Sequence, residues 1–417
     1  MRHLPTLLLS LLLGVAAPTL AQTGCPDFRA TNYTPGATRN DGSCQYPTTV
    51  ATLLTRATLP AEVRESSALQ VAGSGLWTLN DSGNDPMLYR VDADRGTITQ
   101  RVRVTNFDNV DWEDLAADGQ YLYVGDFGNN AGNRTDLRIL RVRQSALNVP
   151  GTDTVSAQAI HFRYPDQTSF AANTNNHNFD AEAFFYSRDS LHIFTKNWAD
   201  RTTTYYTVPA APGTYVARRR ATFNTRGFIT AADLNPAGTA ACLFGYEPRT
   251  GAVFAWLLFD FRAGEFLAGS ARRIELPNAL VTGQVEGVCF LDAYRLLLSN
   301  EQLTTPLGTV PPRLYALDTS PWIAPATTTP TAKPSKATGF QVYPNPATRG
   351  AWLHSTVRLP GPTALTVLDA QGRTVGKATL PTGQQEQLLP LAGAAAGVYF
   401  LKIQWGNGLV VQRFILQ

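Results

Sequence analysis

Short runs of alternating apolar and polar residues extend from about residue 51 to residue 320, and this pattern predicts β-strands. Five units recur within the segment. In each unit an acidic residue opens an apolar run, and after a turn a second apolar run ends in polar residues. Further apolar runs follow in most units, so each unit predicts a small antiparallel sheet. The five opening residues are Glu65, Glu113, Glu182, Asp233 and Glu286.

These units predict an all-β fold whose main body is a five-bladed β-propeller over residues 51–322. The last unit has three clear strands, so we expect residues 51–60 to add the outer strand and close the ring. The interval between the second and third units is longer than the others. Residues 171–178 within it form either a long loop or part of a sixth blade.

Three other segments flank this body. Residues 1–21 hold basic and then apolar residues, followed by small ones, which is typical of a secretion signal peptide. Their apolar run is shorter than the roughly 20 residues needed to cross a bilayer, so we expect no membrane span. Residues 323–338 are rich in Thr and Pro and predict an extended linker. Residues 339–417 again alternate and predict a small β-sandwich.

Composition and motifs narrow the function classes. Charged residues make up 16% of the chain, and the formal net charge is only +3. Lys and Arg are scattered along the sequence, which argues against a nucleic acid partner. The chain has neither a GxSxG nucleophile motif nor a phosphate-binding glycine loop, and this argues against covalent acyl transfer.

The four cysteines fall into two pairs. Cys25 and Cys44 bound a polar module over residues 22–48, and in an exported protein this predicts a disulfide. Cys242 and Cys289 lie inside apolar runs. They either pair between neighbouring blades or are buried as small hydrophobic residues.

The C-terminal segment carries an ordered series of motifs. They are VYPNP at 342–346, LDAQGR at 368–373, AGVYFLK at 396–402 and VQRF at 411–414. In this order they closely resemble the type IX secretion system C-terminal sorting domain. The resemblance implies passage through the periplasm, a secreted or outer-membrane surface location, and the type IX secretion machinery as the partner of residues 340–417.

Propeller geometry brings the recurrent polar residues together. The inner strand of each blade starts, and its second strand ends, at the same mouth of the central channel. Carboxylates that share such a space repel one another unless a cation neutralises them. Calcium suits them, because hard cations prefer carboxylate and amide oxygens. The predicted metal ligands are Asp81, Glu113, Asp126 and Glu182.

Further roles are predicted at the same mouth. The catalytic candidates are Glu113, Asp126, Glu182 and Lys196. The candidate ligand-binding residues are Glu65, Asp81, Asp111, Asn129, Arg134, Glu286 and Glu301. Two alternatives stay open. The acidic residues could instead accept hydrogen bonds from backbone amides of adjacent blades, or Lys196 and Arg134 could act as internal counter-charges.

The loops at 80–85, 111–114 and 126–134 read NDSGND, DWED and DFGNNAGNR. They resemble signatures of secreted propellers and, more distantly, those of SdiA-regulated, phytase-esterase-like and calcium-dependent lactonase-like propellers. Two functions follow from this resemblance and from the acidic mouth. The first, which we favour, is binding of an extracellular ligand or partner without turnover. The second is a divalent-cation-dependent hydrolase acting on a lactone, ester or phosphoester.

Overall fold

The computed structural model describes residues 22–324, except 263 and 307, and residues 339–417, except 349, 358, 371, 406 and 407. The predicted signal peptide and almost all of the predicted linker lie outside these residues. The chain divides into two compact units, Met1–Ala324 and Pro325–Gln417. Strands dominate the described residues, so the all-β class is confirmed. The helices described are short: η1 (Ala61–Val63), α1 (Gln144–Leu147), α2 (Ala279–Thr282) and α3 (Ser320–Ile323).

Within its described residues, the N-terminal unit contains five sheets of four or five strands. The first sheet contains β5 (Gln70–Ala72), β6 (Gly75–Thr78), β7 (Met87–Val91), β8 (Ile98–Val104) and β12 (Thr154–Val155). The second contains β9 (Trp112–Ala117), β10 (Tyr121–Asp126), β11 (Arg138–Arg143), β13 (Gln158–Arg163) and β17 (Gly213–Val216). The third contains β14 (Ala181–Ser187), β15 (Ser190–Thr195), β16 (Thr203–Pro209) and β18 (Arg218–Phe223).

The remaining sheets of this unit follow the same plan. The fourth contains β19 (Phe228–Leu234), β20 (Ala240–Glu247), β21 (Ala252–Phe259), β22 (Ser270–Glu275) and β3 (Thr49–Val50). The fifth contains β23 (Gln284–Phe290), β24 (Arg295–Glu301), β27 (Arg313–Asp318) and β4 (Leu54–Thr58). Two small pairs accompany them: β1 (Thr23–Gly24) with β2 (Arg39–Asn40), and β25 (Leu303–Thr305) with β26 (Gly308–Val310).

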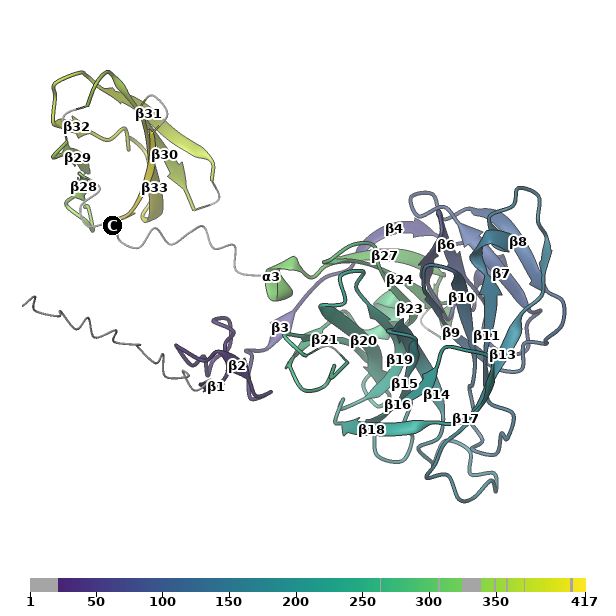
Figure 1. The fold of residues 1–417 in the computed structure, drawn as a ribbon. Coiled ribbons are helices and arrows are strands. Elements are labelled where there is room, and N and C mark those ends of the chain that lie inside the picture. Colours follow the sequence, from purple (N-terminus) through teal and green to yellow (C-terminus); the bar gives the residue numbers. More distant parts are fainter. Residues whose placement is uncertain are drawn as a thin grey trace, which may run out of the picture. The chain divides into compact units, whose positions relative to one another are not determined.

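The first strands of the five sheets, called here the inner strands, contact one another in turn. β5 contacts β9, and the contacts continue through β14, β19 and β23 back to β5. Strands β9, β14, β19 and β23 are labelled in Figure 1. A separate hydrophobic cluster fills each space between neighbouring sheets. Each cluster takes residues from both of its sheets, for example Trp77 and Leu115, Ile139 and Phe184, Phe194 and Leu243, Phe244 and Leu298, or Leu76 and Leu297. The core is therefore divided among five interfaces between sheets.

The N-terminal end of the body closes this cycle, as predicted. Strand β4 pairs antiparallel with β27 of the last unit, with Thr58 opposite Arg313. Leu59, which follows β4, is buried in the cluster between the fifth and first sheets. The long interval between the second and third units holds no strand over residues 171–178, so this segment is the loop among the two predicted alternatives.

The cysteine predictions have mixed outcomes. Cys25 and Cys44 form the predicted disulfide, with their Cα atoms 4.8 Å apart. Cys242 and Cys289 are free and fully buried, so the pairing alternative is wrong. Cys242 packs in the cluster between the fourth and fifth sheets, whereas Cys289 packs between the fifth and the first. They lie on opposite sides of the fifth sheet and act as small hydrophobic residues.

The C-terminal unit consists of two sheets around one core, as the alternation predicted. One sheet contains β28 (Phe340–Tyr343), β29 (Trp352–Ser355) and β32 (Glu386–Leu388). The other contains β31 (Thr374–Leu380), β30 (Thr363–Asp369), β33 (Gly397–Trp405) and β34 (Gly408–Leu416). Across the described part of the chain, no helix combines the length and apolar character that a membrane crossing needs.

Candidate functional site

A β-bulge recurs in four of the inner strands. In each of these strands one extra residue has no partner on the second strand of the sheet. Bulges of this kind often occur next to binding sites, where they redirect a side chain. Three of the inserted residues are the predicted acids Glu113, Glu182 and Glu286, so their equivalence is confirmed. In β19 the inserted residue is Thr230. The predicted equivalence of Asp233 is wrong, because Asp233 lies three residues further along that strand.

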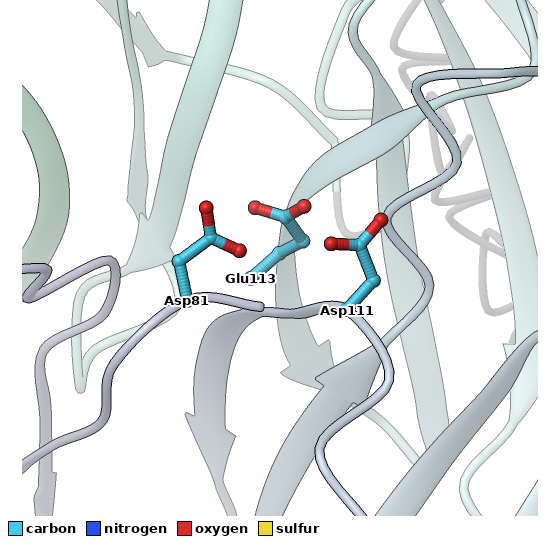
Figure 2. A group of neighbouring side chains, drawn as sticks. All are labelled: Asp81, Asp111 and Glu113. Atoms are coloured by element: carbon cyan, nitrogen blue, oxygen red, sulfur yellow. The ribbon is translucent and has the colours of Figure 1, made fainter. Parts of the chain in front are cut away.

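Asp81, Asp111 and Glu113 form a compact group, called here the acidic cluster. One carboxylate oxygen from each residue lies within 4.8 Å of the others. Asp81 follows β6, and Asp111 directly precedes β9, which carries Glu113. Figure 2 shows the Glu113 carboxylate between the other two, with all three groups pointing the same way. The cluster therefore joins the first and second sheets.

The loop after β10 passes close to this cluster. A Cβ atom at Gly128 would lie 2.1 Å from Glu113 Oε1 and 2.5 Å from Asp111 Oδ2, so a larger residue does not fit there. Asp81 accepts a hydrogen bond from the backbone N–H of Ser82. Glu113 is 5% exposed, and within the described residues its carboxylate has no hydrogen-bond or ion-pair partner.

The three carboxyl groups hold protons more tightly than usual. Burial, followed by the negative charges of Asp81 and Glu182, raises the pKa of Glu113 well above its ordinary value. Burial and the charge of Asp81 raise the pKa of Asp111 to about 7. Burial also raises the pKa of Asp81. Ionising all three groups together is therefore costly without a nearby cation.

Lys196 neutralises a different carboxylate. Its ammonium group forms a buried ion pair with Glu182, and the Nζ atom lies 4.7 Å from the centre of the Trp198 ring. The rings of Phe228 and Tyr246 are each 5.9 Å from the same atom. Burial opposes the charge, but the Glu182 carboxylate raises the pKa of Lys196 well above its ordinary value. Lys196 is thus the predicted internal counter-charge, and Glu182 is its partner.

Asp126 lies outside the acidic cluster, although it was predicted as a metal ligand. One carboxylate oxygen is 3.0 Å from Arg134 and the other is 2.7 Å from Arg138. Arg134 also pairs with Asp136 at 3.0 Å. The side chain of Asn129 donates to the backbone of Phe179 and accepts from the backbone N–H of Arg134, both at 2.9 Å. These residues therefore hold the 126–134 loop in place.

Three further predicted residues lie near the ends of strands in the fifth and first sheets. Glu286 accepts a hydrogen bond from Gln284 at 3.3 Å, and burial raises the pKa of its carboxyl group. Burial, together with the charge of Glu286, raises the pKa of Glu301 well above its ordinary value. Glu65 accepts a hydrogen bond from the side chain of Asn84.

Two buried carboxylates connect neighbouring sheets through backbone amides. Asp233 accepts from the N–H of Phe290 at 2.7 Å, and Asp114 accepts from the N–H of Phe184 at 3.0 Å. For Asp233 this is the structural alternative that the sequence left open. Asp114 was not among the predicted site residues.

Asp180 was also missed by the sequence analysis. It accepts hydrogen bonds from the N–H of Asn129 at 2.6 Å and from the indole of Trp198 at 2.7 Å. Its charge acts on both Asp111 and Glu113. A signal was present, because Asp-x-Glu occurs at 180–182 as it does at 111–113.

The comparisons with known proteins bear on the C-terminal unit. Residues 341–417 match the secretion system C-terminal sorting domain. This unit is a type IX sorting domain. The sorting domain implies export by type IX secretion, interaction with the secretion machinery, and a secreted or cell-surface location.

No curated protein matches the chain. The solved structures that resemble it include the following two, both at low identity. Hydrazine synthase from Kuenenia stuttgartiensis is 11% identical, with 85% of this chain and 97% of the other covered at a TM-score of 0.33. An exo-β-1,3-galactanase from Phanerochaete chrysosporium, solved with galactose, is 9% identical, with coverages of 91% and 92% and a TM-score of 0.38. Because these TM-scores are low, neither similarity supports an inference about this chain.

Proposed function

We propose that the N-terminal unit is a five-bladed β-propeller that binds calcium at its channel mouth through Asp81, Asp111 and Glu113. The exported protein uses this ion to hold an extracellular ligand. The cyclic contacts of the five inner strands support the propeller. The proximity of the three carboxylates supports the ion, because hard cations take oxygen ligands from carboxylates.

The single observation that carries the proposal is the absence of a counter-charge for Glu113 among the described residues. Neighbouring carboxylates are compensated: Asp126 by two arginines and Glu182 by Lys196. A buried carboxylate without a partner is costly, so an ion between Glu113 and the two aspartates would remove an evident energetic penalty. Six to eight oxygens usually surround calcium, so three carboxylates leave positions for oxygens of a ligand.

Calcium titration of the purified protein tests this proposal. We expect the melting temperature to rise with calcium concentration, because an ion that binds only the folded state stabilises it by about 2.7 kcal/mol at 100 times its Kd. Glu113→Gln should stabilise the calcium-free protein, since it removes a buried charge, and should abolish most of the calcium shift. Asp85→Asn is the matched control, because Asp85 lies in the loop that carries Asp81 but pairs with Arg103.

The proposal fails if calcium and magnesium leave the wild-type melting temperature unchanged. It also fails if Glu113→Gln responds to calcium as strongly as Asp85→Asn does. Isothermal titration calorimetry would separate loss of the ion from loss of the fold.

A hydrolase is the second candidate, and the raised pKa values of the Glu286 and Glu301 carboxyl groups favour it. Burial and neighbouring negative charges raise the pKa of both carboxyl groups, and a carboxyl group that keeps its proton can donate it to a leaving group. The ion would polarise the bond to be broken, as in hydrolysis of a lactone or phosphoester. The test is calcium-dependent turnover of such substrates. If the protein shows this turnover and Glu301→Gln loses it, catalysis replaces ligand binding as the proposed function.

A further inference from the structure

A pocket lies at the outer edge of the third sheet, away from the inner strands and from the acidic cluster. It has a volume of about 450 Å³. Its walls are residues 218–221 of the edge strand β18 and residues 264–268 of the loop between β21 and β22, and Tyr205 contributes to its lining. Strand β18 is labelled next to β16 in Figure 1.

The pairing of β18 with β16 determines which arginines face this pocket. Arg218 lies opposite Thr207, Arg219 opposite Tyr206, and Ala221 opposite Tyr205. Side chains alternate between faces along a strand, so the side chain of Arg218 shares the face of Tyr205. Arg219 borders the pocket as part of the strand, but its side chain lies on the other face. Arg219 accordingly pairs with Asp166 at 3.3 Å, which also accepts from the hydroxyl of Tyr206 at 2.8 Å.

Arg220 is the extra residue of a β-bulge between these paired positions. It lines the pocket together with Arg218 and Tyr205, and its positive charge acts on two buried groups. Burial and, to a smaller extent, the positive charge of Arg220 lower the pKa of His192 to about 4. The same charge also lowers the pKa of Tyr205, against the larger effect of burial. Arg220 therefore belongs to the pocket lining beside Arg218 and Tyr205, and its charge acts on the two buried groups next to it.

Neither Arg218 nor Arg220 has an ion pair within the part of the chain that the structure describes. Both side chains belong to exposed residues. The acidic residue that lines the pocket, Glu265, likewise forms no ion pair among those residues. Two guanidinium groups with free donors on one side of a small cavity attract an oxyanion, since their planar forks match sulfate, phosphate and carboxylate oxygens.

We propose that this pocket binds a sulfate or phosphate group through Arg218 and Arg220, either as a free ion or as a substituent of an extracellular polysaccharide. This site is independent of the proposed calcium site. The bulge at Arg220 adds a guanidinium beside that of Arg218, while Arg219 is engaged by Asp166 on the opposite face. Tyr205, which lines the pocket, is hydrogen-bonded to the buried His192.

The hydrogen bonds of His192 define this floor. The carbonyl of Ser187 lies 3.2 Å from Nε2, so that nitrogen carries the proton. Nδ1 therefore accepts from the Tyr205 hydroxyl at 2.6 Å. The imidazole also stacks on Phe185, with ring centres 5.2 Å apart. An anion bound at Arg220 would change the electrostatic environment of this buried imidazole, which makes His192 a local reporter.

The first test measures binding of sodium sulfate, sodium phosphate and sulfated dextran to the full mature protein, with neutral dextran as the negative control. The double variant Arg218→Gln/Arg220→Gln removes both guanidiniums. Arg219→Gln is the matched control, because it removes the same charge from the same strand on the other face. We expect the double variant to bind roughly tenfold or more weakly, and Arg219→Gln to bind like the wild type.

The second test follows the imidazole signals of His192 by NMR during the same titrations. Binding in the pocket should shift them in the wild type and in Arg219→Gln but not in the double variant. Binding of sulfate or phosphate ions alone identifies a free-ion site, and binding of sulfated dextran as well identifies a polysaccharide site. The proposal is overturned if no probe binds, if the two variants lose affinity equally, or if His192 does not respond.

Discussion

The carboxylate of Asp233 accepts a hydrogen bond from the backbone N–H of Phe290 at 2.7 Å, which connects the inner strands β19 and β23. Asp233 is 6% exposed and Phe290 is 3% exposed, so neither group has water as an alternative partner. Removing the acceptor leaves a buried N–H unpaired. The Asp233–Phe290 hydrogen bond therefore supports the contact between the fourth and fifth sheets.

We expect Asp233→Ala to lower the free energy of unfolding by about 2 kcal/mol, because it leaves the Phe290 N–H without a partner. Asp233→Asn keeps a carbonyl oxygen at the same position and should cost less. Urea unfolding monitored by tryptophan fluorescence measures both variants. Equal losses in the two variants would show that the hydrogen bond does not contribute.

The same residue should make stability depend on pH. Burial raises the pKa of Asp233 to about 7 in the folded protein, above the ordinary value of 3.8. Between these values the folded state binds more protons than the unfolded state, so stability from this group falls as pH rises from about 4 to about 7. Asp233→Asn should flatten that part of the profile by up to about 1.4 kcal/mol per pH unit. An unchanged slope would show that Asp233 ionises normally.

Much of the architecture was predictable because it depends on local periodicity. The alternation predicted the strands, the five units and the closing strand β4, and the acids at 113, 182 and 286 were recognised as equivalent. Asp233 was misassigned because Thr230 occupies the bulge in β19, and a bulge has no signature in a single sequence. The ion pair between Asp126 and Arg138 depends on strand register, because Arg138 lies directly opposite Asp126 on β11. Register between strands follows from turn geometry that the sequence alone does not specify.

Calcium affinity should increase with pH. Burial and the charge of Asp81 raise the pKa of Asp111 to about 7, so the calcium-free protein carries a proton there at acidic pH. A carboxylate must lose its proton before it binds a cation. We therefore expect the apparent Kd to fall as pH increases from about 6 to about 8, as measured by calorimetry. A Kd that is constant over this range would argue against Asp111 as a ligand.

Deletion of residues 51–60 should destabilise the N-terminal unit strongly. The deletion removes β4, which pairs with β27, and Leu59, which is 3% exposed between the fifth and first sheets. Loss of one buried leucine side chain alone costs about 2–5 kcal/mol, and the exposed edge of β27 adds a risk of aggregation. Deletion of residues 22–48 is the comparison, because it leaves that pairing intact. The melting temperature should fall much further when residues 51–60 are deleted than when residues 22–48 are deleted.

Deletion of residues 340–417 should stop export without unfolding the rest of the protein. Each of the two compact units has its own hydrophobic core, and the core of the C-terminal unit draws only on residues from Phe340 onward. The N-terminal unit should therefore keep its melting temperature when the sorting domain is removed. Because that domain is the part matched to type IX secretion, the shortened protein should accumulate in the periplasm of a type IX-competent cell.

Immunoblots of cell fractions and culture medium measure where the shortened protein accumulates, with the full-length protein carrying the same tag as the control. Appearance of the shortened protein in the medium at the full-length level would show that export uses another part of the chain.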